Sequence, residues 1–222
     1  MIGYYDYSMF LTYLSAVSAV VGVVLTLSAG GHPHLGTAAL LLCGLCDAFD
    51  GKVARTKSDR TELEKRFGIQ VDSLADLLAF GMLPAAIGAA LYRQSLLGAA
   101  KTRMAYSILL FAVMALYVLA ALIRLAYFNV TEEERQQLDH GARRTYVGLP
   151  VTASALIFPA VILLGRLLPM DITPVYLSVM LFTGAAFVGR FRVRKPGLRG
   201  ILALVALGLA EFVLLLVLRQ MR

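Results

Sequence analysis

Seven stretches of apolar residues, most of them about 20 residues long, constrain this sequence more than any other feature. A helix of about 20 residues crosses the hydrocarbon core of a bilayer, so each stretch is long enough, or nearly so, to span a membrane. Only 16% of the residues are charged, against roughly 25% in soluble domains. We therefore predict an all-α, polytopic transmembrane helical bundle of about 6–7 membrane helices, with residues 1–222 forming a single domain. The stretches run approximately over 9–29, 35–53, 69–92, 103–127, 149–168, 172–189 and 199–218.

Two features leave the number of spans open. The fifth and sixth stretches are joined by the short turn "LPMD", so this pair could instead be a helical hairpin or contain a helix kinked at Pro174. The last stretch, 199–218, contains the lone acid Glu211. An acid within a membrane segment either pairs at a helix or dimer interface, or marks a segment that does not span. A homodimer is therefore left open.

The net charge of +7 comes from basic residues that gather in short polar segments between the apolar stretches. Such bases face anionic lipid headgroups, so we expect membrane lipids as partners and no nucleic acid. Basic residues are most frequent after the second, fourth and sixth stretches. The positive-inside rule then places the N-terminus and the end of the second stretch on the cytoplasmic side. We predict a multi-pass protein of the plasma membrane whose polar active-site cavity faces the cytoplasm.

Four aspartates lie where the apolar stretches meet one polar loop. Asp47 and Asp50 end the second stretch, and Asp72 and Asp76 begin the third. Each ionised carboxylate within a bilayer costs about 2.5–3.5 kcal/mol, so a compensating charge is needed. Residues three or four apart share a helix face, and the two helices are antiparallel, so both pairs lie at the same end. Four hard oxygen ligands suit Mg²⁺, Mn²⁺ or Ca²⁺, with two ions about 4 Å apart. The alternatives are salt bridges with nearby bases at the helix ends, or the cation site of a transporter.

The residues around these acids suit a phosphorylated ligand. Gly51 and Gly68 flank the loop and let a phosphate approach the backbone, and Ala54 is small for the same reason. Lys52 and Arg55 could neutralise phosphate oxygens. Together with the metal-binding acids, these residues predict a diphosphate site.

The two segments "DAFDGKVAR" and "GIQVDSLAD" resemble the signature of the CDP-alcohol phosphotransferases, D-x-x-D-G-x-x-A-R followed by G-x-x-x-D-x-x-x-D. All eight positions are filled, by Asp47, Asp50, Gly51, Ala54, Arg55, Gly68, Asp72 and Asp76. The usual gap of eight residues between the arginine and the second glycine is twelve residues here, "TKSDRTELEKRF". Four extra residues amount to about one helical turn, so the loop differs while the acids keep their register.

This resemblance implies an enzyme in which a CDP-activated lipid or headgroup reacts with an alcohol and CMP is released. It implies a two-ion site of Mg²⁺ or Mn²⁺ held by Asp47, Asp50, Asp72 and Asp76, with Asp76 also the general base on the acceptor hydroxyl. The expected CDP and diphosphate contacts are Asp47, Gly51, Lys52, Ala54, Arg55 and Gly68.

Three further stretches resemble the integral-membrane phosphatidylserine synthases: "SLADLLAFGMLPA", "RLAYFN" and "YVGLP". This branch implies CDP-diacylglycerol and L-serine as substrates. Arg124 and Asn129 are then candidates for binding serine, because a guanidinium suits its carboxylate. Arg124 could instead snorkel from a helix end. The alternative acceptors are glycerol 3-phosphate and inositol phosphate, for which the bases in 190–199 could bind the acceptor phosphate.

Overall fold

The computed structural model describes residues 2–29, 31–95, 103–138, 145–168, 170–194 and 197–220. Within these residues the chain forms eight α-helices, a π-helical segment, two 3₁₀ turns and two short strands. The α-helices are α1 (Phe10–Leu27), α2 (Pro33–Ala54), α3 (Glu62–Asp76), α4 (Leu83–Gln94), α5 (Arg103–Leu138), α6 (Ser154–Leu167), α7 (Thr173–Val188) and α8 (Leu198–Gln220). The other elements are η1 (Tyr7–Met9), the π segment η2 (Leu77–Met82), η4 (Val151–Ala153), β1 (Thr145–Val147) and β2 (Arg192–Arg194).

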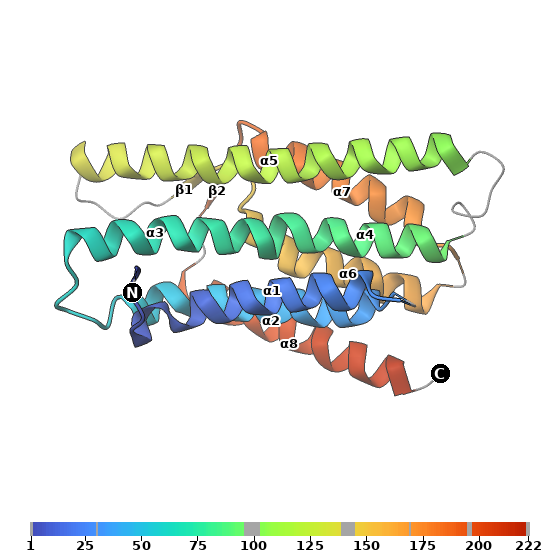
Figure 1. Ribbon diagram of the computed structural model, residues 1–222, viewed down its shortest axis with the longest axis horizontal. Helices are drawn as coiled ribbons and strands as arrows, with labels where there is room; N and C mark the ends of the chain where they lie inside the picture. The colour runs from blue at the N-terminus through green and yellow to red at the C-terminus, as the bar shows by residue number, and fades with distance from the viewer. Residues whose placement is uncertain are drawn as a thin grey trace.

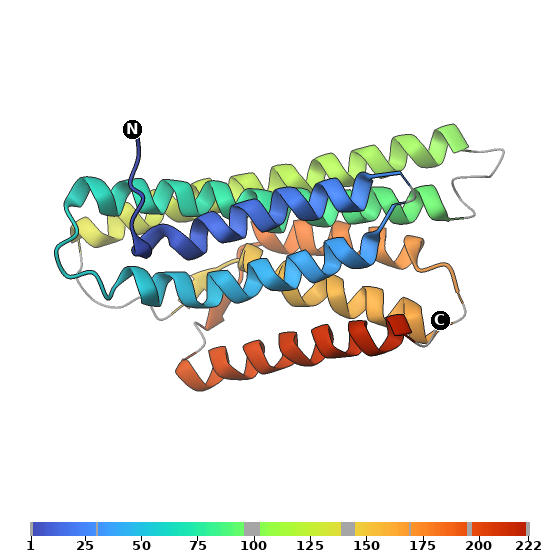
Figure 2. The ribbon, with the colours of Figure 1, turned by 60° about the horizontal axis from the view of Figure 1, so that its bottom comes forward.

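The helices run side by side along one axis and form a bundle (Figure 1). The α3–η2–α4 rod passes through the middle, with α5 on one side of it and α1 and α2 on the other. The helix α8 is the outermost on the far side of α2 (Figure 2). The α2–α3 loop (residues 55–61) and the N-terminus lie at one end of the bundle, and the C-terminus lies at the other end.

This is an integral membrane protein. Among the described residues, four helices are long and apolar enough to cross a membrane, Tyr7–Leu27, Glu62–Gln94, Met104–Glu134 and Arg199–Leu218. The helices over Val151–Leu167 and Thr173–Val188 are apolar but shorter. Every one of the seven predicted stretches is helical, which confirms the predicted fold class.

Both segments that leave the number of spans open are helical. Helices α6 and α7 are separate, and Pro174 lies in the first turn of α7, where its missing N–H costs no hydrogen bond. The last stretch is long and apolar enough to span. Glu211 on α8 is only 8% exposed and therefore faces the bundle.

Small residues let α2 approach its neighbours closely. A Cβ atom on Gly22 of α1 would lie 2.7 Å from the Cβ of Ala39, and one on Gly44 would lie 2.5 Å from the Cβ of Ala155 on α6. Neither distance is compatible with a side chain, so both contacts require glycine. Without a hydrophobic driving force inside lipid, such close backbone packing is a main source of helix association.

The π segment η2 begins one residue after Asp76 and is fixed by a tyrosine from α5. Pro84 has no N–H to donate to the carbonyl of Phe80, four residues earlier. The hydroxyl of Tyr117 donates to that carbonyl instead, at 2.6 Å, and also contacts Ser154 Oγ at 2.9 Å. Tyr117 is 1% exposed. The freed backbone oxygen is therefore satisfied inside the bundle, as a chain within lipid requires.

A two-stranded antiparallel ribbon joins the chain before α6 to the chain after α7. Thr145 pairs with Arg194 and Val147 with Arg192. Gly148 follows at φ +75°, and its N–H donates to the Phe191 carbonyl at 2.7 Å. A Cβ at Gly148 would lie 2.6 Å from the Phe187 carbonyl oxygen, so the glycine of "YVGLP" is required by the backbone here.

Candidate active site

The α2–α3 loop begins and ends with local hydrogen bonds that the sequence itself supplies. After α2, Thr56 N–H and Oγ1 both donate to the Val53 carbonyl. Before α3, Thr61 and Glu64 form a capping box, in which Glu64 N–H donates to Thr61 Oγ1 and Thr61 N–H to the Glu64 carboxylate. Helix α3 therefore starts at Glu62, six residues before Gly68. Much of the twelve-residue gap is the first part of a helix rather than loop.

A lysine in the loop ties it to the N-terminal segment. Lys57 Nζ lies 2.6 Å from Asp6 Oδ2 and 3.1 Å from Glu64 Oε1. Asp6 also accepts from the N–H of Ser8, at 2.9 Å. The hydrogen bond from Lys57, with that from Ser8, lowers the pKa of Asp6 to about 2, and the same two carboxylates raise the pKa of Lys57. The segment before α1 is thereby held against the loop.

The structure brings together the acid cluster of Asp47, Asp50, Asp72 and Asp76. Asp50 and Asp72 face each other across α2 and α3, and Asp76 lies within electrostatic range of the other three. Asp50 is only 9% exposed. Two carboxylates this close repel each other unless they share a proton or a cation. The site therefore has a local deficit of positive charge.

No basic side chain corrects this deficit in the part of the chain that the structure describes. The ion pairs there join Lys57 to Asp6 and Glu64, and Lys65 to Glu62. Lys52 Nζ lies over the ring of Phe49, 5.3 Å from its centroid. This arrangement argues against the alternative that the acids are helix-end salt bridges.

The donor set fits a divalent cation in its chemistry and charge, because carboxylate oxygens are the ligands that Mg²⁺ and Mn²⁺ prefer. The side chains do not form a closed ligand shell. Among the described residues, no three His, Cys, Asp or Glu side chains are grouped closely enough to hold a metal ion as they stand.

The predicted diphosphate contacts lie around the end of α2. The guanidinium of Arg55 lies over Gly51, where a Cβ would be 3.4 Å from Arg55 Nη1. Gly68 is covered in the same way by Arg60 from the loop, because a Cβ there would lie 2.7 Å from Arg60 Nη2. Arg60 Nη1 also reaches the Ala54 carbonyl. Arg60 was not among the predicted site residues, and only its place in the lengthened loop marks it in the sequence.

The two candidates for acceptor binding lie on α5. Asn129 Nδ2 donates to Ser73 Oγ at 2.8 Å, and Ser73 Oγ lies 3.1 Å from Asn129 Oδ1. Because Ser73 follows Asp72, these contacts attach Asn129 to the helix that carries half of the acid cluster. Arg124 is only 6% exposed, and its guanidinium lies 5.2 Å from the ring centroid of Phe128. Its burial in the bundle argues against the snorkelling alternative.

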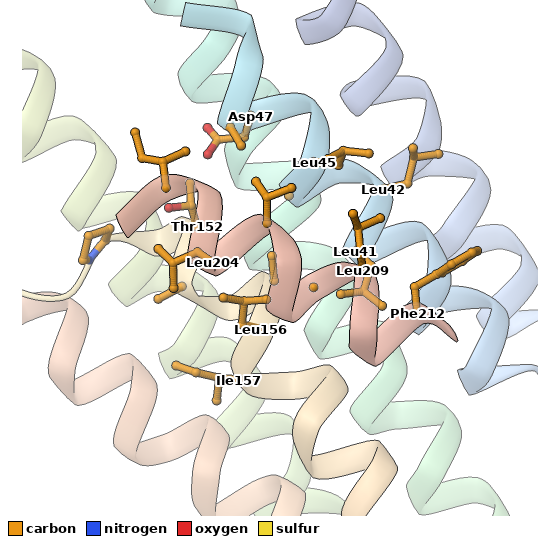
Figure 3. Close-up of a pocket in the computed structure, with 18 of the residues that line it drawn as sticks. Leu41, Leu42, Leu45, Asp47, Thr152, Leu156, Ile157, Leu204, Leu209 and Phe212 are labelled. Carbon is orange, nitrogen blue, oxygen red and sulfur yellow. The ribbon is translucent and has the colours of Figure 1, made fainter. Parts of the chain in front are cut away.

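An apolar pocket of about 960 Å³ adjoins the acid cluster. Helices α2, α6 and α8 form most of its walls, with residues 149–153 and β2 near one end. Asp47 lies at one end of the pocket and Phe212 toward the other, with leucines of α2 and α8 between them (Figure 3). The sequence does not reveal this pocket, because pocket-lining and lipid-facing residues are of the same types. The small residues Gly44 and Ala48 on α2 are the one available signal.

Comparisons with known proteins agree with this arrangement. The family model for CDP-alcohol phosphatidyltransferase matches residues 7–189. The chain is 34% identical over 155 residues to the CDP-diacylglycerol–serine O-phosphatidyltransferase of Saccharomyces cerevisiae, an alignment covering 67% of this chain and 50% of the yeast protein. It is 27% identical over 188 residues to the Helicobacter pylori protein of the same name, covering 83% of this chain and 71% of that one. It is also 30% identical over 155 residues to the archaetidylserine synthase of Methanothermobacter thermautotrophicus, covering 70% and 57%.

The chain thus spans about half the length of the yeast relative and 71% of the Helicobacter one. The matched region contains the acid cluster, the α2–α3 loop and the helices that form the bundle core. The chain belongs to the CDP-alcohol phosphatidyltransferase family.

Proposed function

We propose that this protein is a phosphatidylserine synthase, which transfers the phosphatidyl group of CDP-diacylglycerol to the hydroxyl of L-serine and releases CMP. One observation carries the proposal beyond the family: Asp47 of the acid cluster also lines an apolar pocket. A substrate that fits has a charged diphosphate at one end and long apolar chains at the other. The names of the relatives support serine as the acceptor.

We assign the following roles to the chain's own residues. Lys52 and Arg55 neutralise diphosphate oxygens, and the small residues Gly51, Ala54 and Gly68 make room at the end of α2. Arg124 binds the serine carboxylate, and Asn129, held by Ser73, orients the acceptor.

In the reaction, the serine hydroxyl oxygen bonds to the phosphorus that carries the diacylglycerol. The anhydride bond to CMP breaks, and the hydroxyl proton passes to the carboxylate of Asp76. Enzymes of this family generally depend on a divalent metal. When bound by Asp47, Asp50, Asp72 and Asp76 as a two-ion site, Mg²⁺ or Mn²⁺ would neutralise the charge of the diphosphate.

The excess of bases after α2, α5 and α7 supports a cytoplasmic position for the acid cluster, where free serine can reach it. We propose the plasma membrane as the location of the protein. The apolar pocket includes Asp47 of this cluster and extends along α2 as far as Ala38. A lipid substrate could therefore keep its chains at membrane depth while its headgroup reacts at the aqueous boundary.

The Asp76→Asn variant tests the catalytic role. We expect it to lose CMP release by about two to four orders of magnitude, as for loss of a general base, while it still binds CDP-diacylglycerol. Asp59→Asn, an exposed aspartate in the adjoining loop, is the matched control and should retain wild-type turnover. Turnover of Asp76→Asn equal to that of the control would contradict the assignment of Asp76.

A further inference from the structure

We propose that Arg60, from the lengthened α2–α3 loop, is a second diphosphate-binding arginine that works as a pair with Arg55. This inference rests on the proposed function, because it assigns a ligand contact within the same nucleotide site. The family signature supplies one arginine at this site, and Arg60 lies in the stretch that is four residues longer here.

The position of Arg60 supports this role. Each glycine of the signature is covered by one guanidinium, Gly51 by Arg55 and Gly68 by Arg60. Arg60 Nη1 also lies 3.4 Å from the carbonyl oxygen of Ala54, one turn beyond Gly51 on α2. Both cations therefore lie around the last turn of α2, on either side of the small residues expected to admit the diphosphate.

Arg60 also has unused hydrogen-bonding capacity. A guanidinium has five N–H donors. Within the described residues, Arg60 makes only two long contacts, to the carbonyls of Ala54 at 3.4 Å and Glu64 at 3.5 Å. Its Nε is buried and has no partner there. Both contacts exceed the usual N–H···O range of about 2.7–3.2 Å, so they hold the guanidinium only weakly.

The charge of Arg60 supports the same role. No carboxylate of the described chain forms an ion pair with Arg60, whereas Lys57 and Lys65 in the same region are both paired. A half-buried guanidinium without a carboxylate suits an anion with several oxygens. The diphosphate of a CDP-lipid carries two negative charges, which two arginines match with bidentate contacts.

Gly68 thereby gains a specific role. It leaves the space that the guanidinium of Arg60 occupies, since a Cβ would lie 2.7 Å from Arg60 Nη2. Gly68 then acts on the diphosphate through Arg60 as well as by its own small size.

The plain alternative is that Arg60 caps the end of α2 by binding the Ala54 carbonyl. Three variants separate the two roles: Arg60→Ala, Arg60→Gln, which retains N–H donors without the charge, and Arg66→Ala, which removes an exposed base of α3. The measurements are KM and kcat for CMP release, and titration calorimetry of the purified protein with CDP, CMP and cytidine in the presence of Mg²⁺.

For Arg60→Ala and Arg60→Gln alike, we expect KM for CDP-diacylglycerol and the Kd of CDP to rise about tenfold to a hundredfold, as for a lost hydrogen bond to a charged group. KM for serine and the weak binding of cytidine should stay unchanged, and Arg66→Ala should match the wild type. Wild-type behaviour of Arg60→Gln, or equal effects in Arg60→Ala and Arg66→Ala, would overturn the inference. A fall in KM would also overturn it, because Arg60 would then obstruct the site.

Failure of the proposed function gives a different result. If the wild type releases no CMP but binds CDP, and Arg60→Gln weakens that binding, the function is wrong and the role of Arg60 stands. If the wild type does not bind CDP at all, both fall.

Discussion

The hydrogen bond from Tyr117 to the π segment should be worth a measurable part of the stability of the bundle. Tyr117→Phe removes the hydroxyl that donates to the Phe80 carbonyl at 2.6 Å and contacts Ser154 Oγ at 2.9 Å. Pro84 cannot supply the missing donor. A buried polar group left without a partner costs about 1–3 kcal/mol, and interhelical bonds measured in membranes average about 0.6 kcal/mol. With two groups affected, we expect a loss of about 2 kcal/mol in the free energy of unfolding.

Tyr176→Phe is the matched control. The Tyr176 hydroxyl donates to the Pro84 carbonyl at 2.9 Å from an equally buried position. That carbonyl lies within α4, where a helical N–H four residues later is also available, so this change should cost only about 0.5–1.5 kcal/mol.

Both variants can be compared by reversible unfolding in mixed micelles, followed by circular dichroism. Because η2 starts directly after Asp76, Tyr117→Phe should also lower kcat more than Tyr176→Phe does. Equal unfolding free energies for the two variants would refute the argument that the proline leaves Phe80 dependent on Tyr117.

Three further predictions concern packing, pH and metal. In Gly44→Val, even the Cβ would lie only 2.5 Å from the Cβ of Ala155. The substitution should therefore lower the free energy of unfolding by about 1–3 kcal/mol and raise KM for CDP-diacylglycerol in the CMP-release assay. An unchanged unfolding free energy and KM would contradict the close contact. The pKa of Asp6 is lowered to about 2, so its ion pair with Lys57 should hold the N-terminal segment fully above about pH 4 and release it as the pH falls toward 2. Amide hydrogen exchange of residues 2–9 in the wild type and in Asp6→Asn, compared at each pH, measures this release. Equal exchange in the two proteins at neutral pH would contradict the role of the ion pair. Chelation with EDTA should abolish CMP release, and added Mn²⁺ or Mg²⁺ should restore it. The added metal should also raise the Tm of the wild type but not that of Asp50→Asn. An equal rise of Tm in both proteins would place the ion elsewhere.

Much of the fold follows from sequence because apolar length alone marks membrane helices. The predicted helix boundaries are wrong where a helix continues through polar sequence beyond its apolar stretch. Helix α3 begins at Glu62 rather than near 69, because the capping box of Thr61 and Glu64 starts a helix in charged sequence. Helix α5 likewise runs through polar residues to Leu138. Apolar composition marks only the part of a helix that lies in lipid. The polar turns of α3 and α5 lie beyond the apolar stretches.

The approach of Asp50 to Asp72 could be foreseen because the predicted acids share helix faces on two adjacent antiparallel helices. The features that depend on tertiary packing could not be foreseen. Nothing local indicates that Tyr117 reaches Phe80, that Asn129 contacts Ser73, or that β1 pairs with β2 across two helices. The position of Arg60 over Gly68 also depends on how the loop folds back on α3.

The most direct test of the central claim is the choice of acceptor by the purified protein. CMP release is measured with CDP-diacylglycerol and Mn²⁺ in the presence of L-serine, glycerol 3-phosphate or inositol phosphate, and the lipid product is identified by mass spectrometry. We predict phosphatidylserine as the product, formed with serine alone and abolished in Asp76→Asn. CMP release that requires a phosphorylated polyol, with none from serine, would contradict it.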